Sequence, residues 1–318
     1  MFIFLRNLMR KLGWLVAIFL MANVFLVHLA LFKHCDAYYS AVHKIAKKFD
    51  RPQIKIFITY YKPYRLPSTK SILVPIQVGR DVEHEPFMKG QLSDGDIAWL
   101  HSRMIGDNTG DNISAKNRSF DVLTAYYWVW KHYKEIGNPR YIGFFAHRKG
   151  LNLGSKFDVY GLDYGIKKEK VLELLKKHKV ISWEWEPYID EDEGMVYVSM
   201  YEDYKIHHHI EDLDQMIRII EQKYPEMSET MNEILYKKEP QAAWNFFIME
   251  KKLAFEYFEK LFDVMFELDK TIGDTVNQRD FYQRRAYRFL AERFFAIWLK
   301  WKQKQGVVDP YWADVAAY

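Results

Sequence analysis

The spacing of hydrophobic positions differs between the two halves of this 318-residue chain. Compact apolar runs occupy residues 54–60, 72–79 and 141–146, which read IKIFITY, ILVPIQVG and YIGFFA. Short apolar runs bounded by polar or turn-forming residues are typical of strands that are buried on both faces of a sheet. We therefore predict three such strands, and Pro75 in the second run favours an edge or irregularly paired position.

After these runs, hydrophobic positions recur at the spacing of a helix, and this pattern dominates the second half of the chain. Ser114 is a good N-cap residue. The positions that recur on one helix face after it are Phe120, Leu123, Thr124, Tyr127 and Trp128. Residues 167–179 predict a helix, and 180–200 predict a strand, an acidic loop and a second strand. Nearly everything from residue 211 onward is predicted to be helical, most clearly 211–223, 250–269 and 280–304.

The N-terminal segment has a different character. Residues 12–32 contain no Asp, Glu, Lys or Arg, and such a run can cross a hydrocarbon layer of ~30 Å. Basic residues flank it on both sides and are more numerous after it, which favours a cytoplasmic location for the rest of the chain. We predict a membrane anchor at the cytoplasmic face of the cell membrane. The alternatives are a helix buried in the core and a helix lying in the membrane interface.

These patterns predict a mixed α/β fold with a mainly helical C-terminal half. The predicted segments are an N-terminal anchor helix at 1–35, a basic linker at 36–53, one domain at 54–305 and a tail at 306–318. Within the domain, residues 54–200 form the α/β part and residues 201–305 form the helical part.

Composition narrows the class of function. The formal net charge of +4 is too small to indicate a nucleic-acid partner, and none is predicted. Cys35 is the single cysteine, which excludes a disulfide framework and favours a reducing compartment.

A polar stretch before a predicted helix is the first candidate site. Residues 107–114 read DNTGDNIS and include Asp107, Asn108, Asp111 and Asn112. A helix N-terminus presents unpaired N–H groups that suit a phosphate or another anion. The same residues also suit simple helix capping, and the local sequence does not decide between the two interpretations.

The second candidate comes after the run at 141–146, where His147, Arg148 and Lys149 occupy a predicted strand end. Ligands of open α/β sheets bind outside the carboxyl ends of the strands, and Arg and Lys suit phosphate oxygens. The alternative is an ordinary basic surface turn.

Further polar candidates lie in the helical half. His208 and Asp212 are four residues apart and are expected to face one site together on a helix. Asn245, Glu292 and Arg293 interrupt apolar patterns, and a buried Glu needs a partner. The acidic triplets at 94–96 and 190–192 are weak signals, so a Mn²⁺ or Mg²⁺ cofactor has no clear motif and metal use stays open.

Several segments together resemble one known family. They are IKIFITYYKPY, PIQVG, DNTGDNIS with Asn117, LTAYYWVWK, IGFF with Arg148, YEDY with His208 and Asp212, NFFIM and FLAERFFAIW. These segments and their order along the chain are similar to those of a bacterial family of capsular and exopolysaccharide biosynthesis proteins. That family was long catalogued as a domain of unknown function and is regarded as glycosyltransferase-like. The resemblance covers roughly residues 54–300.

The resemblance implies a GT-A-like nucleotide-sugar fold and sugar transfer to a growing glycan. The donor would be a nucleotide sugar, with a UDP-sugar favoured, and the acceptor would be lipid-linked or a polysaccharide. The residues that it places at the donor are Tyr60, Tyr61, Lys62, Asp107, Asn108, Asn112, Asn117, Arg148 and Lys149. The residues that it offers for catalysis are Asp111, His208 and Asp212.

The sequence departs from the family in two segments. The family reads His-Tyr-Arg-Arg followed by an aromatic, whereas this chain has Ala146, His147, Arg148, Lys149 and Gly150, of which Arg148 alone is retained. Near the end, Arg288 stands where the family has Gly. These changes support an alternative, a non-catalytic, membrane-tethered protein that binds glycans or assists their assembly.

Overall fold

The computed structural model describes residues 53–67, 72–87, 90–153, 166–185, 188–191, 194–239 and 241–317. The chain divides into two units, Met1–Arg51 and Pro52–Tyr318, and the described residues belong to the second. The predicted anchor at 1–35 and the linker up to residue 52 lie outside the described residues. Within the described ranges, no helix is both long and apolar enough to cross a membrane.

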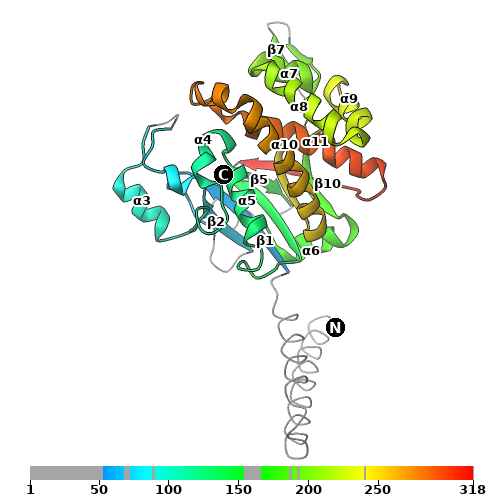
Figure 1. Cartoon of the computed structure of the whole chain (residues 1–318). Coiled ribbons are helices and arrows are strands. Elements are labelled where there is room, and N and C mark those ends of the chain that lie inside the picture. Colours follow the sequence, from blue (N-terminus) through cyan, green and yellow to red (C-terminus); the bar gives the residue numbers. More distant parts are fainter. Residues whose placement is uncertain are drawn as a thin grey trace, which may run out of the picture. The chain divides into compact units, whose positions relative to one another are not determined.

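A nine-stranded mixed sheet forms the centre of this unit (Figure 1). Its strands are β1 (Ile54–Tyr60), β2 (Leu73–Gln77), β3 (Ile105–Gly106), β4 (Tyr141–Ala146), β5 (Lys149–Asn152), β6 (Val180–Trp185), β9 (Gln241–Glu250), β10 (Tyr311–Trp312) and β11 (Asp314–Ala317). The order is β10-β6-β9-β4-β1-β2-β3, with β5 paired to β4 and β11 paired to β5. A separate hairpin joins β7 (Tyr188–Glu191) and β8 (Gly194–Tyr197).

The directions of the strands bring several carboxyl ends to the same edge of the sheet. β1 runs parallel to both β2 and β4, and β2 runs parallel to β3. β9 runs antiparallel to β4 and β6. The carboxyl ends of β1, β2 and β4 therefore open at the same edge, which is where α/β sheets bind ligands.

Helices cover both faces of the sheet. They are α3 (Asp94–His101), α4 (Asn117–Phe120), α5 (Leu123–Lys131), α6 (Lys168–Lys177), α7 (Met200–His207), α8 (Ile210–Lys223), α9 (Ser228–Tyr236), α10 (Lys251–Asn277) and α11 (Ala286–Lys304). The 3-10 turns are η1 (Arg80–Val82), η2 (Ser114–Lys116), η3 (Pro225–Met227) and η4 (Gln283–Arg285). Each face of the sheet has its own hydrophobic core, and successive residues of β1 point to opposite faces. Ile56 and Ile58 belong to the core with α3 and α6, whereas Phe57 belongs to the larger core on the other face.

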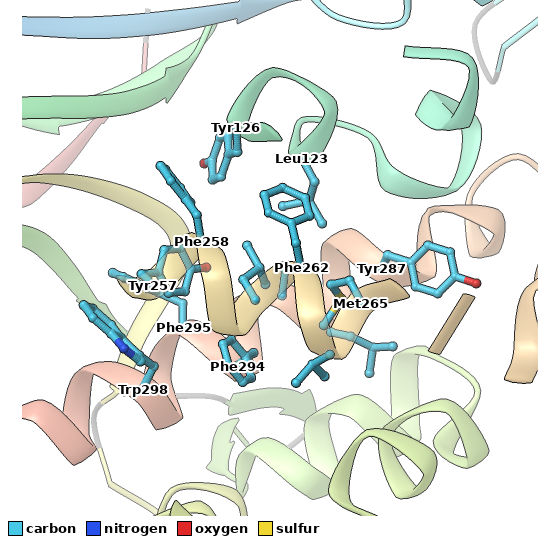
Figure 2. Close-up of a cluster of buried hydrophobic side chains, with 14 of the residues drawn as sticks. Leu123, Tyr126, Tyr257, Phe258, Phe262, Met265, Tyr287, Phe294, Phe295 and Trp298 are labelled. Atoms are coloured by element: carbon cyan, nitrogen blue, oxygen red, sulfur yellow. The ribbon is translucent and has the colours of Figure 1, made fainter. Parts of the chain in front are cut away.

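Aromatic rings on α5, α10 and α11 pack together in the larger core (Figure 2). The Tyr257 ring lies 5.1 Å from Trp298 and 5.3 Å from Phe295. Tyr126 of α5 packs against Phe144 of β4 in a tilted arrangement, with 4.0 Å between ring centroids. Buried rings of this size carry much of the hydrophobic stabilisation, so α11 is firmly fixed against the sheet.

The predicted runs at 54–60 and 141–146 are confirmed as β1 and β4. The irregular pairing expected at Pro75 is confirmed, because β3 pairs with residues 76 and 77 of β2 and leaves Pro75 without a β3 partner. The prediction of helices after residue 211 is wrong at residues 241–250, which form β9. This strand pairs with both β4 and β6, so the C-terminal half contributes to the middle of the sheet.

Two further expectations at the first polar stretch are wrong. Ser114 is not an N-cap: it is the first residue of η2, and its hydroxyl donates to Asp107. The single helix expected after it is interrupted at Asp121, where φ is +48° between α4 and α5. The Asn117 amide donates to the Asp121 carbonyl at 2.8 Å and stabilises this break.

Gly79 provides a test of how β2 ends. Its φ is +66°, and a Cβ atom at this position would overlap the Asn117 amide. We expect Gly79→Ala to destabilise the fold by more than the ~1–2 kcal/mol that a left-handed alanine costs. Gly306→Ala is the matched control, because Gly306 has a φ of +68° with open space around it. Urea unfolding of both variants measures the difference; equal losses would contradict the predicted overlap.

Candidate active site

A cavity of about 790 Å³ opens at the carboxyl ends of β1, β2 and β4. The strand ends supply Tyr61, Gln77 and His147, and the first helical layer supplies Asn117 and Asp121. α7, η4 and α11 close the opposite side. The volume is within the range of small-molecule sites, which is ~300–1,000 Å³.

Positive charge predominates in the lining. Among the described residues, seven basic ones line the cavity: Arg118, Arg148, Lys149, Arg284, Arg285, Arg288 and Arg293. The described acidic ones are Glu83, Asp121, Asp203 and Glu292. A cavity with this excess of cations suits an anionic ligand.

Charged residues on α11 form the helical wall. Arg288 donates to the Asp121 carboxylate at 2.9 Å, and its Nε lies 3.5 Å from Glu292. Arg293 pairs with Asp203 of α7 at 2.5 Å. Burial raises the pKa of the Glu292 carboxyl, while the charges of Arg288 and Arg293 oppose that rise. The ion pairs connect α11 to α4 and α7 across the cavity wall.

The tight turn between β4 and β5 forms another part of the lining. Ala146 pairs with Lys149, which leaves His147 and Arg148 at the turn. Arg148 is exposed, and His147 is buried with its ring 5.2 Å from Tyr61. Burial, reinforced by the charge of Arg148, lowers the pKa of His147 to about 4. A neutral His147 thus supports a turn that presents cationic side chains to the cavity.

His208 comes directly after α7 and belongs to an aromatic stack. Its ring lies 4.0 Å from Phe289 at an interplanar angle of 20°, and 6.0 Å from Tyr282. The Nδ1 atom lies 3.3 Å from the Gln283 side-chain oxygen. Burial, reinforced by the charge of Arg293, lowers the pKa of His208 to about 4. The imidazole is therefore neutral at pH 7.

The structure brings about half of the sequence-predicted site residues to the cavity. Those that line it are Tyr61, Asn117, Arg148, Lys149, His208, Glu292 and Arg293. Those outside the lining are Tyr60, Lys62, Asp107, Asn108, Asp111, Asn112, Asp212 and Asn245.

Asp107 is fully buried behind the end of β2. Its carboxylate accepts hydrogen bonds from the backbone N–H of Gly79 at 2.8 Å and of Arg80 at 3.2 Å, and from the Ser114 hydroxyl at 2.6 Å. Burial raises the pKa of this carboxyl, and these hydrogen bonds oppose the rise. The geometry assigns Asp107 to holding the strand end that borders the cavity.

The rest of the DNTGDNIS stretch also has local partners. Asn108 donates to Asp81 at 3.0 Å, and Asn112 accepts from the backbone N–H of Ser114 at 3.0 Å. The Asp111 side chain is 62% exposed and accepts from the Tyr127 hydroxyl at 2.9 Å. Turn stabilisation accounts for these contacts without a ligand.

Three other predicted residues that lie outside the cavity lining also have contacts of their own. The Tyr60 hydroxyl donates to the Arg65 carbonyl at 2.7 Å, and Lys62 lies 5.8 Å from the Tyr61 ring. Asn245 is buried with a φ of +54°, and its carbonyl accepts from the Tyr126 hydroxyl at 2.9 Å.

Asp212 and His208 do not share a helix face, so that expectation is wrong. α7 ends at His207 and α8 begins at Ile210, which places the two residues on different elements. Asp212 is buried and forms a two-bond pair with Arg279, at 2.5 and 2.8 Å.

Neither acidic triplet contributes a described carboxylate to the cavity. Asp94 and Asp96 begin α3, where Asp96 and Ser93 form a capping box, and the side chains of 190–192 lie outside the described ones. In the described part of the chain, no group of three or more His, Cys, Asp or Glu could hold a metal ion. The four described carboxylates that line the cavity already pair with Arg, Gln or His.

Sequence reasoning missed much of the helical wall. The missed residues are Asp121, Asp203, Arg284 and Arg285, and Arg288 was noted just as a departure from the family. Asp203 lies within the YEDY segment that carries the resemblance, so that segment held a usable signal. Asp121 offered none, because its importance depends on Arg285 and Arg288 more than 160 residues away.

The fold is similar to that of a solved glycosyltransferase. The apo structure of the bifunctional glycosyltransferase WbbM matches with a TM-score of 0.66 and 24% sequence identity. The match covers 83% of this chain and 45% of that chain, so the present chain spans less than half of WbbM. A search of curated proteins finds no match.

A family model described as a domain of unknown function, DUF4422, matches residues 55–304. The match confirms the family resemblance that the sequence segments indicated, and it includes every described side chain assigned to the cavity. The chain therefore belongs to the DUF4422 family.

Proposed function

We propose that the protein is a glycosyltransferase that moves a sugar from a nucleotide-sugar donor to a lipid-linked or polysaccharide acceptor. The observation that carries this proposal is the cation-rich cavity at the carboxyl ends of three parallel strands. Such edges bind nucleotides in open α/β folds, and a diphosphate requires nearby positive charge. The likeness to WbbM, a bifunctional glycosyltransferase, supports a glycosyltransferase assignment.

The donor diphosphate fits best beside the turn between β4 and β5. Arg148 is exposed there and is free to form two parallel bonds with phosphate oxygens. Tyr61 lines the same end of the cavity and offers a ring for the nucleobase of a UDP-sugar.

The transfer step balances without a further reactant. The oxygen of an acceptor hydroxyl forms a bond to the anomeric carbon, and the bond from that carbon to the donor phosphate oxygen breaks. The nucleoside diphosphate leaves with the bonding electron pair, and a base takes the hydroxyl proton. Of the three residues offered by the sequence, His208 lines the cavity, and its neutral imidazole can accept this proton.

We further propose that residues 12–32 anchor the protein at the cytoplasmic face of the cell membrane. Support comes from the uncharged length of the run and its basic flanks. A lipid-linked acceptor would then be presented close to the cavity.

Replacing Arg148 tests the donor site. Charge-assisted hydrogen bonds contribute ~1.5–3 kcal/mol each, so Arg148→Ala should raise the Kd for UDP at least tenfold. Arg148→Lys should raise the Kd less, because lysine keeps the positive charge but cannot form two parallel hydrogen bonds to phosphate oxygens. Calorimetric titration with UDP measures these changes.

Arg140→Ala is the matched control for this titration. Arg140 precedes β4 at the opposite end of the same strand and pairs at 3.6 Å with Glu250, so UDP affinity should be unchanged. An unchanged Kd in well-folded Arg148→Ala protein would remove Arg148 from the donor site.

Removing the N-terminal segment tests the anchor. The full chain should sediment with membranes, whereas a chain starting at Asp50 should remain in the supernatant. A carbonate wash separates a spanning helix, which stays in the pellet, from a peripheral one. Equal amounts of both chains in the soluble fraction would refute the anchor.

A further inference from the structure

Three arginines form a cluster on the helical side of the cavity, away from the turn between β4 and β5. Arg284 and Arg285 belong to η4, and Arg118 belongs to α4. All three line the cavity. The charge of Arg284 contributes to lowering the pKa of Arg118, which places these two guanidinium groups within electrostatic reach of one another. We call these three residues the arginine cluster.

The positive charge of the arginine cluster is incompletely balanced within the described residues. Arg118 approaches Glu85 at 3.4 Å, and Arg285 approaches Asp121 at 3.4 Å, although Asp121 also accepts from Arg288 at 2.9 Å. Arg284 forms no ion pair with any described residue; its guanidinium donates to the Arg279 carbonyl at 3.4 Å. The three guanidinium groups thus face two carboxylates, Glu85 and Asp121, and Asp121 is shared with Arg288.

Unsatisfied donors in the same cluster point to a missing acceptor. The Nε–H groups of Arg284 and Arg285 are buried and meet no hydrogen-bond acceptor among the described residues. Buried donors of this kind are rare in native proteins and require an explanation, such as a bound ion. An anion beside the arginine cluster would satisfy them and supply the absent negative charge.

Aromatic rings continue the same surface. Phe281 and Tyr282 line the cavity yet remain 41% and 43% exposed. The Arg285 guanidinium lies 4.9 Å from the Tyr282 ring, and the Arg284 guanidinium lies 5.8 Å from the Phe281 ring. The anion therefore belongs to a ligand with an apolar or ring-shaped body beside its charged group.

The segment that carries the arginine cluster is held in a fixed conformation. The Asp280 carboxylate accepts from the backbone N–H groups of Tyr282 at 2.7 Å and Gln283 at 3.0 Å. Gln283 also donates to the His207 carbonyl at 2.8 Å, which ties the segment to α7. A preorganised segment reduces the entropy lost on binding.

We propose that the arginine cluster is a second anion site, which binds the phosphate or diphosphate group of the acceptor. This inference rests on the proposed function, in which the turn with Arg148 takes the donor diphosphate. The acceptor would then carry its own phosphate, as the diphosphate of an isoprenoid lipid or as a sugar phosphate. Its apolar or sugar portion would lie along Phe281 and Tyr282.

Competition and direct binding by the full-length protein test the second site. Farnesyl diphosphate serves as the isoprenoid probe and galactose 1-phosphate as the sugar-phosphate probe, each titrated in the presence of saturating UDP. We expect at least one probe to bind under these conditions. Binding of farnesyl diphosphate alone identifies a lipid source, and binding of galactose 1-phosphate alone identifies a sugar source. If neither probe binds, or if UDP competes with both, the second site is refuted.

Single substitutions then locate the site. Arg284→Ala should raise the Kd of the bound probe at least tenfold and leave the Kd of UDP within about twofold, whereas Arg148→Ala should do the opposite. Arg218→Ala is the control, since Arg218 is a surface residue of α8 that bonds Gln215. Equal losses of UDP and probe affinity in Arg284→Ala would mean one shared anion site and overturn the inference.

The donor hypothesis fails in a distinguishable way. If the wild type does not bind UDP, the proposed UDP-sugar donor is wrong. The probe titrations with and without Arg284→Ala still show whether the arginine cluster binds phosphate. An unchanged probe affinity in Arg284→Ala would refute the cluster whatever UDP does.

Discussion

Charge buried along one side of α11 is the constraint on which the cavity depends. Arg293 and Asp203 are 6% and 5% exposed, and each is deprived of much of its hydration. Loss of one partner from a buried pair costs about 3–5 kcal/mol, because the other charge is left uncompensated. α11 and α7 must therefore stay in register, and Arg288 imposes a similar requirement between α11 and α4. The aromatic core beneath α11 fixes the helix, and its ion pairs fix the cavity wall.

The requirement that a buried charge has partners also explains the first polar stretch, and it does so without a ligand. Asp107 is fully buried, and its carboxylate requires donors once water is removed. Gly79 and Arg80 at the end of β2 and Ser114 at the start of η2 supply them, so these two places meet at one carboxylate. That meeting point sets the end of β2 and the start of η2. Its contribution to function is to hold Asn117 and the end of β2 at the cavity.

The cavity has two chemically different sides because two parts of the chain build it. The strand ends contribute the turn between β4 and β5, with Arg148 and Lys149. The C-terminal helices contribute the arginine cluster and the exposed rings of Phe281 and Tyr282. The proposed sugar transfer would require two substrates to be held against each other, and effective concentration depends on their relative placement. β9 joins the two parts, since it continues into α10 while pairing with β4.

The sequence by itself determined the elements whose pattern is local. β1 and β4 are uninterrupted apolar runs with polar boundaries, and α8 and α11 repeat at helical spacing, so each could be located without knowledge of its neighbours. Arg148 was predicted for a similar reason, because a strand end is visible in the sequence. β9 was missed because its apolar run passes into α10 at residue 251 without a turn residue to mark the boundary.

The tertiary structure decided which polar residues face the cavity. Asp107 and Asp111 stand four residues apart in one polar stretch, yet one is buried at a strand end and the other is exposed to solvent. Asp121 pairs with Arg288, which lies 167 positions away in the sequence. The two residues come together only when the sheet and the helices pack. A carboxylate looks the same in the sequence in each case. Its burial and its partner fix its role, and both depend on contacts between distant segments that no local pattern encodes.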